Sequence, residues 1–323
     1  MTSHITSMRT SSADVGCFET GPLISVIIPT YNRAPLLRRT LAEYRRQTYR
    51  ADRFELIVVS DGSTDDTDAV VDAAVADLPY QLKFATVPHA GPAAARNRGI
   101  ELARGEHILF TGDDIFPDPR LLEQHALASA NNPSAGILGF IEWSTDLEVT
   151  DFMRFVAPAG PQFDYTDIKD PLNCGHAKFY GANISIPAGW AHQERFDETI
   201  SSATVEDHEY GYRLEKRGLR IVYNPLAVGF HYHPMTHASF LERLEQAGKA
   251  IRYLWEIHPE LEKQLRPLPL LPIGLLRSVL RLAPACRLVS QKLFWQLTLM
   301  ESYLRGIGSV RTDTQTSVPR QRR

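Results

Sequence analysis

Three acidic segments hold residues whose types and spacing could support chemistry. Asp61 and the pair Asp113-Asp114 each come directly after an apolar run, and Glu206-Asp207 opens a stretch of helical character. A carboxylate repels phosphate unless a cation lies between them, and Mg2+ or Mn2+ binds one or two carboxylates together with phosphate oxygens and water. The aspartates are therefore candidate ligands of a divalent cation that bridges to a diphosphate. A plain turn is the alternative at both places, and it is favoured for Asp61 because Asp-Gly pairs are common in turns.

The Glu206-Asp207 pair suggests a general base. A carboxylate within hydrogen-bonding reach of an acceptor hydroxyl can take its proton as the hydroxyl attacks. Acidic residues are also favourable at a helix N-terminus, where they meet the positive end of the helix dipole. Both interpretations stay open on the sequence alone.

Histidine, arginine and asparagine residues add to this set. His231 and His233 flank Tyr232 at the end of an expected strand, so both imidazoles point to one face and one could complete a metal shell. Arg96 could reach a phosphate or a ribose, and Asn183 could bind a sugar hydroxyl. The structural alternatives are a surface pair for the histidines, an exposed helix face for Arg96 and a turn for Asn183.

Alternating strands and helices are expected to position these residues. Short apolar runs predict strands at 23–29, 54–60, 80–87 and 107–111. Helical patterns between them lie at 34–47, around 70–75 and at 91–105. Elements that alternate at this spacing form a parallel, doubly wound sheet with right-handed crossovers. Ligands gather beyond the carboxyl ends of such strands, so the polar residues that end each run should converge in one cleft.

The second half of the chain is less regular. Strand-like runs occupy 136–143, 179–187 and 219–224, and helical patterns occupy 205–217, 238–257 and 286–305. The expected fold is α/β, with a mainly parallel, doubly wound, Rossmann-like sheet and a helical C-terminal extension. No internal repeat is visible in the sequence.

Length, composition and the lack of certain motifs exclude several classes of protein. The chain has 323 residues, 43% of them hydrophobic and 23% charged, which is typical of a globular protein of about two domains. It contains neither a P-loop nor a dinucleotide-binding glycine fingerprint, so kinase and dehydrogenase functions lose their main support. Three widely spaced cysteines indicate a reducing compartment, and the first twenty-odd residues lack the apolar run of a secretory signal. We therefore expect a cytoplasmic protein.

Charge is unevenly distributed along the chain. The formal net charge is −3, but residues 266–323 carry ten Lys/Arg against two Asp/Glu, which leaves an acidic body. An acidic body argues against general nucleic-acid binding. The basic tail lacks an uninterrupted apolar stretch of about eighteen residues, so it is not expected to span a bilayer. Its leucine-rich helices suit the surface of an anionic membrane, peripherally on the cytoplasmic face, and packing on the catalytic domain or formation of an oligomer is the alternative.

Six segments follow one another along the chain: SVIIPTYNR, VVSDGSTDDT, GPAAARNRGIELARGEHILF, TGDDIFPDP, NISIP and VEDHEYGYRLEKRGLRIVYNP. Together and in this order they resemble a family 2 glycosyltransferase of the GT-A fold, an inverting enzyme that uses nucleotide sugars. The resemblance covers about residues 23–235. The expected organisation is a flexible arm at 1–21, a GT-A domain at 22–235 with a nucleotide-binding half at 22–118 and an acceptor half at 119–235, a helical extension at 236–310 and a flexible basic tail at 311–323.

The resemblance implies a role for each candidate residue. On the donor side, the nucleotide is bordered by Thr30, Tyr31, Arg33 and Arg96, the base (usually uracil) is hydrogen-bonded by Asp61, and the ribose or sugar is contacted by Asp113. The metal, Mn2+ or Mg2+, is bound on the diphosphate by Asp114, with His231 ranked above His233 as a further ligand. On the acceptor side, the catalytic base is Asp207, its support is Glu206, and a sugar contact is Asn183.

Two positions depart from the family pattern. Gly112 stands where many members have the first Asp of the metal motif, and Ser60 stands where many have the first Asp of an Asp-Asp pair. The implied reaction is a single in-line displacement with inversion. It would move a sugar from a nucleotide sugar, expected to be a UDP-sugar, to a hydroxyl acceptor such as a lipid-linked or cell-surface glycan precursor. The alternatives are a non-catalytic nucleotide-sugar-binding module of a membrane-associated assembly complex and a nucleotidyltransferase, which usually has a Gly-rich loop that this first strand lacks.

Overall fold

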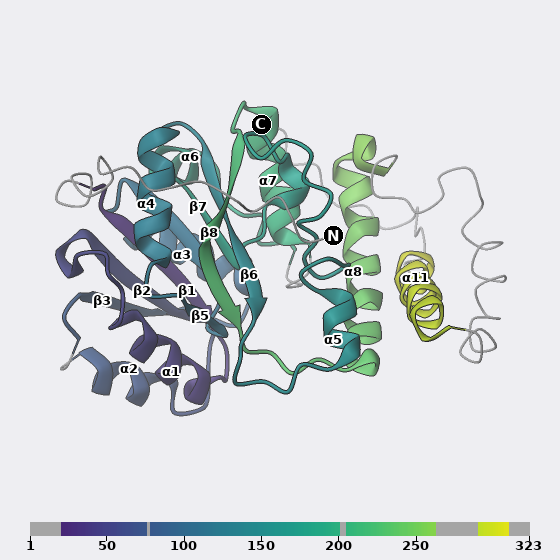
Figure 1. Ribbon diagram of the computed structural model, residues 1–323, viewed down its shortest axis with the longest axis horizontal. Coiled ribbons are helices and arrows are strands. Elements are labelled where there is room, and N and C mark those ends of the chain that lie inside the picture. The colour runs from purple at the N-terminus through teal and green to yellow at the C-terminus, as the bar shows by residue number, and fades with distance from the viewer. Residues whose placement is uncertain (1–20, 76–77, 201–204, 263–289, 310–323) are drawn as a thin grey trace, which may run out of the picture. The chain divides into compact units, whose positions relative to one another are not determined.

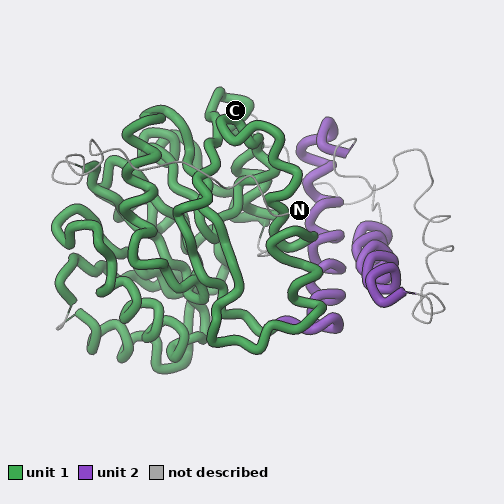
Figure 2. Tube along the Cα trace, in the orientation of Figure 1, with its two compact units in different colours: residues 1–234 green, residues 235–323 purple. Residues whose placement is uncertain are grey.

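A computed structural model describes residues 21–75, 78–200, 205–262 and 290–309 (Figure 1). The chain divides into two compact units, unit 1 at residues 1–234 and unit 2 at residues 235–323 (Figure 2). Unit 1 is built around one sheet with helices, and the described part of unit 2 is helical.

The sheet of unit 1 has eight strands in the order β3-β2-β1-β4-β7-β6-β8-β5. The strands are β1 (Ile24–Thr30), β2 (Phe54–Ser60), β3 (Gln81–Thr86), β4 (His107–Thr111), β5 (Ile115–Pro117), β6 (Gly136–Trp143), β7 (Asn183–Pro187) and β8 (Ile221–His231). Neighbours among β3, β2, β1 and β4 are parallel, as are β6 and β8. Strand β7 is antiparallel to β4 and β6, and β5 is antiparallel to β8. The predicted α/β fold with a mainly parallel sheet is confirmed, and the reversal at β7 and the short β5 are additions to it.

Helices cover both faces of this sheet (Figure 1). They are α1 (Ala34–Tyr44), α2 (Thr67–Val75), α3 (Pro92–Leu102), α4 (Leu121–Asn131), α5 (Asp151–Val156), α6 (Ala188–Gln193) and α7 (Glu206–Lys216). Ile28 and Val58 pack with α1, α2 and α4 on one face. On the other face Ile27 lies against Gly99 of α3, and Phe110 packs edge-on against Tyr210 of α7. Burial on both faces explains why these strands are continuous apolar runs rather than alternating ones.

Strand β8 is longer and more irregular than the predicted run at 219–224. Its register against β6 shifts between Gly139, which pairs with Asn224, and Phe140, which pairs with Val228. Beyond this bulge β8 continues to His231, so the strand carries the predicted histidine pair to the same edge as the end of β4. The predicted strand at 179–187 is shortened to β7, and the predicted helix at 34–47 ends at Tyr44.

The described part of unit 2 consists mainly of α8 (His237–Ile257) and α11 (Gln291–Ser309), with a short turn of helix at Pro259–Leu261. A capping box of Thr236 and Ser239 begins α8. The two long helices approach closely where Gly248 and Gly306 meet. A side chain at either position would overlap the backbone of the other helix, so this approach requires glycine at both positions. None of the described helices is long and apolar enough to cross a membrane. Most of the basic tail lies outside the described residues.

Candidate active site

Most of the candidate residues lie around the carboxyl ends of β1, β2 and β4. Because β7 runs antiparallel to β4, with Asn183 opposite Thr111, the segment that leads into β7 lies beside the carboxyl end of β4. Thr111 donates a hydrogen bond from Oγ1 to the carbonyl of Ala182, 3.2 Å away, which holds the two segments together. Residues from both halves of unit 1 therefore meet at one edge of the sheet.

Asp113 is buried at this edge, with each carboxylate oxygen engaged. Thr30 Oγ1 donates to Asp113 Oδ2 over 2.7 Å, and Arg33 Nη1 donates to Asp113 Oδ1 over 3.2 Å. The Asp113 carbonyl accepts a further hydrogen bond from Thr40 Oγ1 at 2.6 Å. Burial and the neighbouring Asp114 raise the pKa of Asp113 to about 6, against the opposing effect of Arg33. The structure thus brings together Thr30, Arg33, Asp113 and Asp114.

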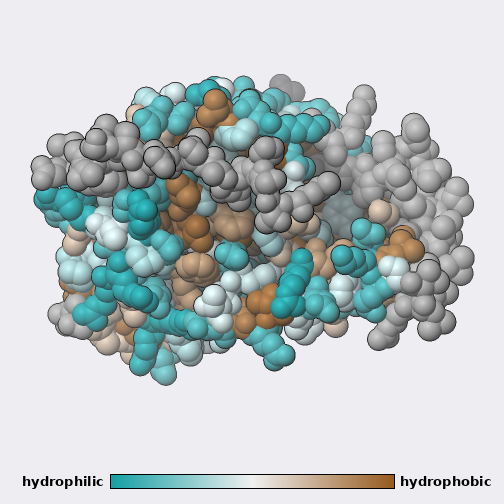
Figure 3. Space-filling model, in the orientation of Figure 1, coloured by the Kyte–Doolittle hydropathy of each residue, from teal (hydrophilic) through white to brown (hydrophobic). Residues whose placement is uncertain are grey.

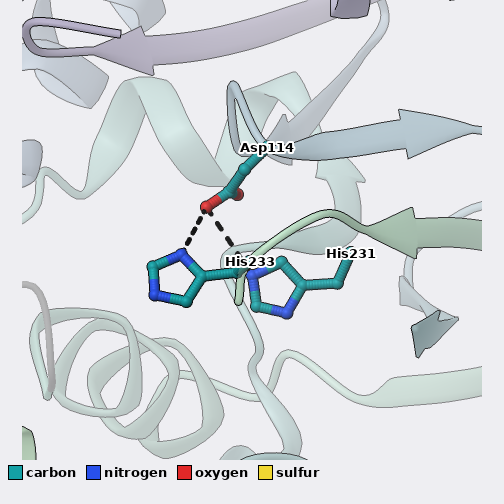
Figure 4. A group of neighbouring side chains, drawn as sticks. All are labelled: Asp114, His231 and His233. Carbon is teal, nitrogen blue, oxygen red and sulfur yellow. Dashed lines mark hydrogen bonds and ion pairs between the residues drawn. The ribbon is translucent and has the colours of Figure 1, made fainter. Parts of the chain in front are cut away.

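The Asp114 carboxylate faces the two histidines His231 and His233 (Figure 4), and Arg33 also contacts it. Its Oδ2 atom is 2.7 Å from Arg33 Nη1, 3.6 Å from His231 Nε2 and 3.3 Å from His233 Nδ1. The backbone N–H of Tyr232 donates to the Asp114 carbonyl over 2.8 Å, which continues the pairing of β5 with β8 and fixes this juxtaposition. Burial alone would raise the pKa of Asp114, but the histidines and Arg33 hold it well below its ordinary value.

The group of Asp114, His231 and His233 fits a divalent cation. One ligand atom from each side chain lies within 4.8 Å of the others, and carboxylate and imidazole are common ligands of divalent transition metals. The His231 ring stacks on Trp143 and on His233. The ring centroids are 5.3 Å apart in both pairs, and the interplanar angles are 10° with Trp143 and 23° with His233. The stack limits rotation of the imidazoles. Trp143 was not among the predicted site residues, and only its place at the end of the 136–143 run could have indicated it.

Asp61 anchors an aromatic pair beyond β2. Its carboxylate accepts hydrogen bonds from the backbone N–H groups of Ala90 at 2.8 Å and Gly91 at 3.0 Å, and Oδ2 lies 2.9 Å from His89 Nδ1. The Tyr31 ring stacks on His89 with centroids 4.1 Å apart and an angle of 18°. Tyr31 is 42% exposed. Where Figure 3 shows described residues, their surface is mostly hydrophilic with hydrophobic patches among them. An exposed aromatic surface next to a carboxylate can receive a nucleobase.

Asp207 lies in the first turn of α7, beside the segment that leads into β7. Its Oδ2 accepts a hydrogen bond from the Gly181 N–H and its Oδ1 accepts one from the His208 N–H, both at 2.9 Å. A Cβ atom at position 181 would be 3.3 Å from Asp207 Cβ and 3.2 Å from Arg96 Nη2, so Gly181 permits this close packing. Since Gly181 precedes Ala182, which Thr111 holds, Asp207 is placed near the end of β4.

Glu206 and Arg96 form a buried ion pair next to Asp207. Arg96 Nη1 lies 2.7 Å from Glu206 Oε1, and the two side chains are 10% and 4% exposed. Burial, followed by the charge of Asp207, raises the pKa of Glu206, and Arg96 opposes this rise. Neither earlier interpretation of Arg96, a phosphate contact or an exposed helix face, describes this arrangement.

Asn183 is not brought to the site. It is 2% exposed, and its Nδ2 donates to the carbonyls of Phe140 and Ala227 at 3.0 and 2.9 Å. Its Oδ1 lies 2.9 Å from His125 Nε2. The amide therefore bridges the bulge between β6 and β8, and these contacts favour a structural role over the expected sugar contact.

The amino-acid sequence of this chain is similar to those of known proteins. The family described as glycosyl transferase family 2 matches residues 25–184. Validoxylamine A glucosyltransferase of Streptomyces hygroscopicus subsp. jinggangensis (strain 5008) is 30% identical over 248 residues, which cover 69% of this chain and 58% of that protein. Chondroitin synthase of Escherichia coli is 26% identical over 258 residues, covering 71% of this chain and 37% of that protein.

Solved structures share the fold. Mannosyltransferase PcManGT from Pyrobaculum calidifontis, in complex with GDP-Man and Mn2+, has a TM-score of 0.65 at 19% identity and covers 90% of this chain and 86% of its own. S. aureus TarS 1-349 in complex with UDP has a TM-score of 0.53 at 18% identity, covering 88% and 90%. The fold is thus the mixed α/β fold of GT-A glycosyltransferases. The chain belongs to glycosyltransferase family 2, as its six motifs indicated, and it spans less than two thirds of the length of the two curated relatives named above.

Proposed function

We propose that this chain is an inverting glycosyltransferase that moves a sugar from a nucleotide-sugar donor, in the first instance a UDP-sugar, to a hydroxyl acceptor. The observation that carries the proposal is the placement of two acidic groups from opposite halves of unit 1 at one sheet edge. Asp113 and Asp114 follow β4, and Asp207 is tied through Gly181 to the segment paired with β4. A donor site next to a candidate base is the arrangement that direct displacement requires.

Each residue of the site has a task in this proposal. Tyr31 and Asp61 receive the nucleobase, while Thr30 and Arg33 orient Asp113 toward the ribose or sugar. Asp114 and His231 would hold Mn2+ or Mg2+, which when bound neutralises charge on the diphosphate. The ion pair of Arg96 with Glu206 holds the start of α7 in place, which supports Asp207 on the acceptor side.

Asp207 acts as the general base. Its two oxygens each accept one backbone hydrogen bond, which fixes the carboxylate and leaves lone pairs for an acceptor hydroxyl. As the hydroxyl oxygen attacks the anomeric carbon, its proton passes to Asp207 and the nucleoside diphosphate departs from the opposite side. One displacement of this kind inverts the anomeric configuration.

The acceptor belongs to the same proposal. The relatives include proteins named for glucosyl transfer to validoxylamine A and for chondroitin synthesis, which supports a small or polymeric hydroxyl acceptor, including a cell-surface or lipid-linked glycan precursor.

We extend the proposal to peripheral contact of the C-terminal part with the cytoplasmic face of a membrane. Co-sedimentation with anionic and with neutral vesicles tests this contact, and equal binding to both would contradict it.

Replacing Asp207 with asparagine tests the function directly. A positioned base contributes about 10²- to 10⁴-fold, so Asp207→Asn should lower transfer by that factor while UDP binding stays unchanged. The assay follows UDP or GDP release from a panel of UDP- and GDP-sugars with Mn2+ and candidate acceptors. Asp151→Asn, at a side chain that is 89% exposed on α5, is the matched control. Normal turnover of Asp207→Asn would refute the assignment, and donor binding with no release or transfer in the unaltered chain would favour a non-catalytic binding module.

A further inference from the structure

We infer that the His89 imidazole occupies the nucleobase position of the donor site when no nucleotide is bound, and that the donor base binds by displacing it. His89 thereby sets how tightly the base is held. This inference deepens the proposed function and rests on it, because it concerns the place beside Tyr31 and Asp61 that would receive the base.

His89 makes both contacts that the proposed function gives to the base. Its imidazole stacks on the Tyr31 ring, with centroids 4.1 Å apart and an angle of 18° between the ring planes. Its Nδ1 atom lies 2.9 Å from Asp61 Oδ2 and 3.1 Å from the Asp61 carbonyl oxygen. A nucleobase is likewise a flat ring with polar atoms at its edge, so the imidazole uses the same two partners in the same way.

A base cannot make both contacts while the imidazole stays in place. Stacked rings are about 3.5 Å apart or more, so a base on the opposite face of Tyr31 would lie two such layers from the imidazole. Asp61 Oδ2 is 2.9 Å from the imidazole and would then be out of hydrogen-bonding reach of that base. A base that stacks on Tyr31 and hydrogen-bonds to Asp61 must therefore take the space that His89 fills.

The imidazole can leave without disturbing the loop that carries it. His89 lies between β3 and α3, and its side chain is 57% exposed. The backbone of this loop is held separately, because the N–H groups of Ala90 and Gly91 donate to the Asp61 carboxylate. A Cβ atom at position 62 would lie 3.0 Å from the His89 backbone nitrogen, so the two loops are closely packed there. Rotation of the imidazole into solvent would free the base position while these backbone contacts remain.

The contact is weak enough for a nucleotide to displace it. An exposed ion pair and a stacked pair of rings each contribute little compared with the affinity of a whole nucleotide. A ligand whose site is open for only a fraction of the time binds with an apparent affinity reduced by that fraction. We expect the imidazole to lower the affinity for a nucleotide about three- to tenfold in this way. Ligands without a base should be unaffected.

Calorimetric titration of the full chain with UDP and, in parallel, with GDP, in the presence of Mn2+, tests this inference. His89→Ala should tighten binding of the nucleotide about three- to tenfold. Inorganic pyrophosphate has no base, so it should bind the unaltered chain and His89→Ala equally. His192→Ala, at an exposed histidine of α6, is the matched control and should bind the nucleotide as the unaltered chain does. Weaker or unchanged binding of the nucleotide by His89→Ala would overturn the inference.

Nuclear magnetic resonance follows the displacement itself. The Hε1 proton of His89, identified by its absence from the spectrum of His89→Ala, should be shifted by the ring current of Tyr31 in the free chain. When UDP or GDP saturates the site, this signal should move toward the position of an exposed histidine, whereas pyrophosphate should leave it unchanged. A His89 signal that does not move at saturation would show that the base binds elsewhere and would overturn the inference.

The outcomes separate this inference from the proposed function. If a nucleotide binds but neither its affinity nor the His89 signal responds as expected, the inference is wrong and the proposed function stands. If neither UDP nor GDP binds the unaltered chain or His89→Ala, the donor site of the proposed function is overturned together with the inference. Circular dichroism and thermal unfolding of His89→Ala show whether a change in binding reflects a change in the fold.

Discussion

Replacing Arg96 with methionine should lower the free energy of unfolding by about 3–5 kcal/mol at pH 8, because it leaves the Glu206 carboxylate buried without a partner. The two side chains are 10% and 4% exposed and their charged atoms are 2.7 Å apart. Unit charges about 4 Å apart attract each other by roughly 4 kcal/mol at an effective dielectric constant of about 20, which is the same order of magnitude.

The loss should also depend on pH, and its direction follows from the pKa of Glu206. Burial and then Asp207 raise this pKa, and Arg96 opposes them, so removal of Arg96 raises it further. Between the ordinary pKa of a glutamate and the raised pKa of Glu206 in the folded variant, the folded variant retains a proton that the unfolded chain has released. The stability of Arg96→Met therefore falls as the pH rises between these two values. Its loss of stability relative to the unaltered chain should be smaller at pH 5 than at pH 8.

A double-mutant cycle measures the pair itself. Urea unfolding of the unaltered chain, Arg96→Met, Glu206→Gln and the double variant gives the coupling energy, and the double variant should recover much of the loss because it leaves no unpaired charge. A deficit of Arg96→Met below about 1 kcal/mol, or one that does not change between pH 5 and pH 8, would show that Glu206 is not held as a buried anion by Arg96.

Three further predictions concern other parts of the chain. Burial lowers the pKa of His125 from 6.5 to about 4, so the unfolded chain takes up a proton first as the pH falls. The free energy of unfolding should therefore fall by up to about 3 kcal/mol between pH 6.5 and pH 4. Urea unfolding of His125→Gln should lack this part of the pH dependence, and the same pH dependence in the variant and the unaltered chain would contradict the prediction. Arg33→Gln should tighten Mn2+ binding without nucleotide about tenfold, because the guanidinium competes for the Asp114 oxygen that faces the histidines; unchanged or weaker binding would count against a cation at that oxygen. Gly306→Val should destabilise the crossing of α8 and α11 by about 1–3 kcal/mol, since a Cβ there overlaps the carbonyl of Glu245; hydrogen exchange should show faster exchange in both helices, with Gly308→Val as control, and equal exchange in the two variants would refute the packing argument.

Local patterns were sufficient for the N-terminal half of the sheet. The runs that became β1, β2 and β4 are apolar because helices bury both faces, and their polar ends could be predicted to meet because parallel strands share one carboxyl edge. The start of α7 at Glu206 was also visible, since acidic residues precede an amphipathic helical stretch that ends near a glycine. These features depend on neighbours close in sequence.

The remaining features depend on partners that are distant in sequence. Strand β5 has three residues and thus no periodicity of its own, and it exists because β8 pairs with it. The bulge in β8 and the amide of Asn183 that fills it are properties of three strands together. Arg96 and Glu206 are 110 positions apart, so nothing near either residue indicates their ion pair. The resemblance to the family ranks His231 above His233, and the spacing of the two histidines does not show that His233 Nδ1 lies 3.3 Å from Asp114.

Asp114 and His233 are 119 positions apart, yet they face each other where β5 begins and the adjacent strand β8 ends. A ligand that binds both side chains acts as a reversible cross-link that closes a loop of more than a hundred residues. Separating the ends of this loop requires the intervening strands and helices to open together. Binding of such a ligand should therefore increase the chain's resistance to proteolysis between these positions, far from the site itself.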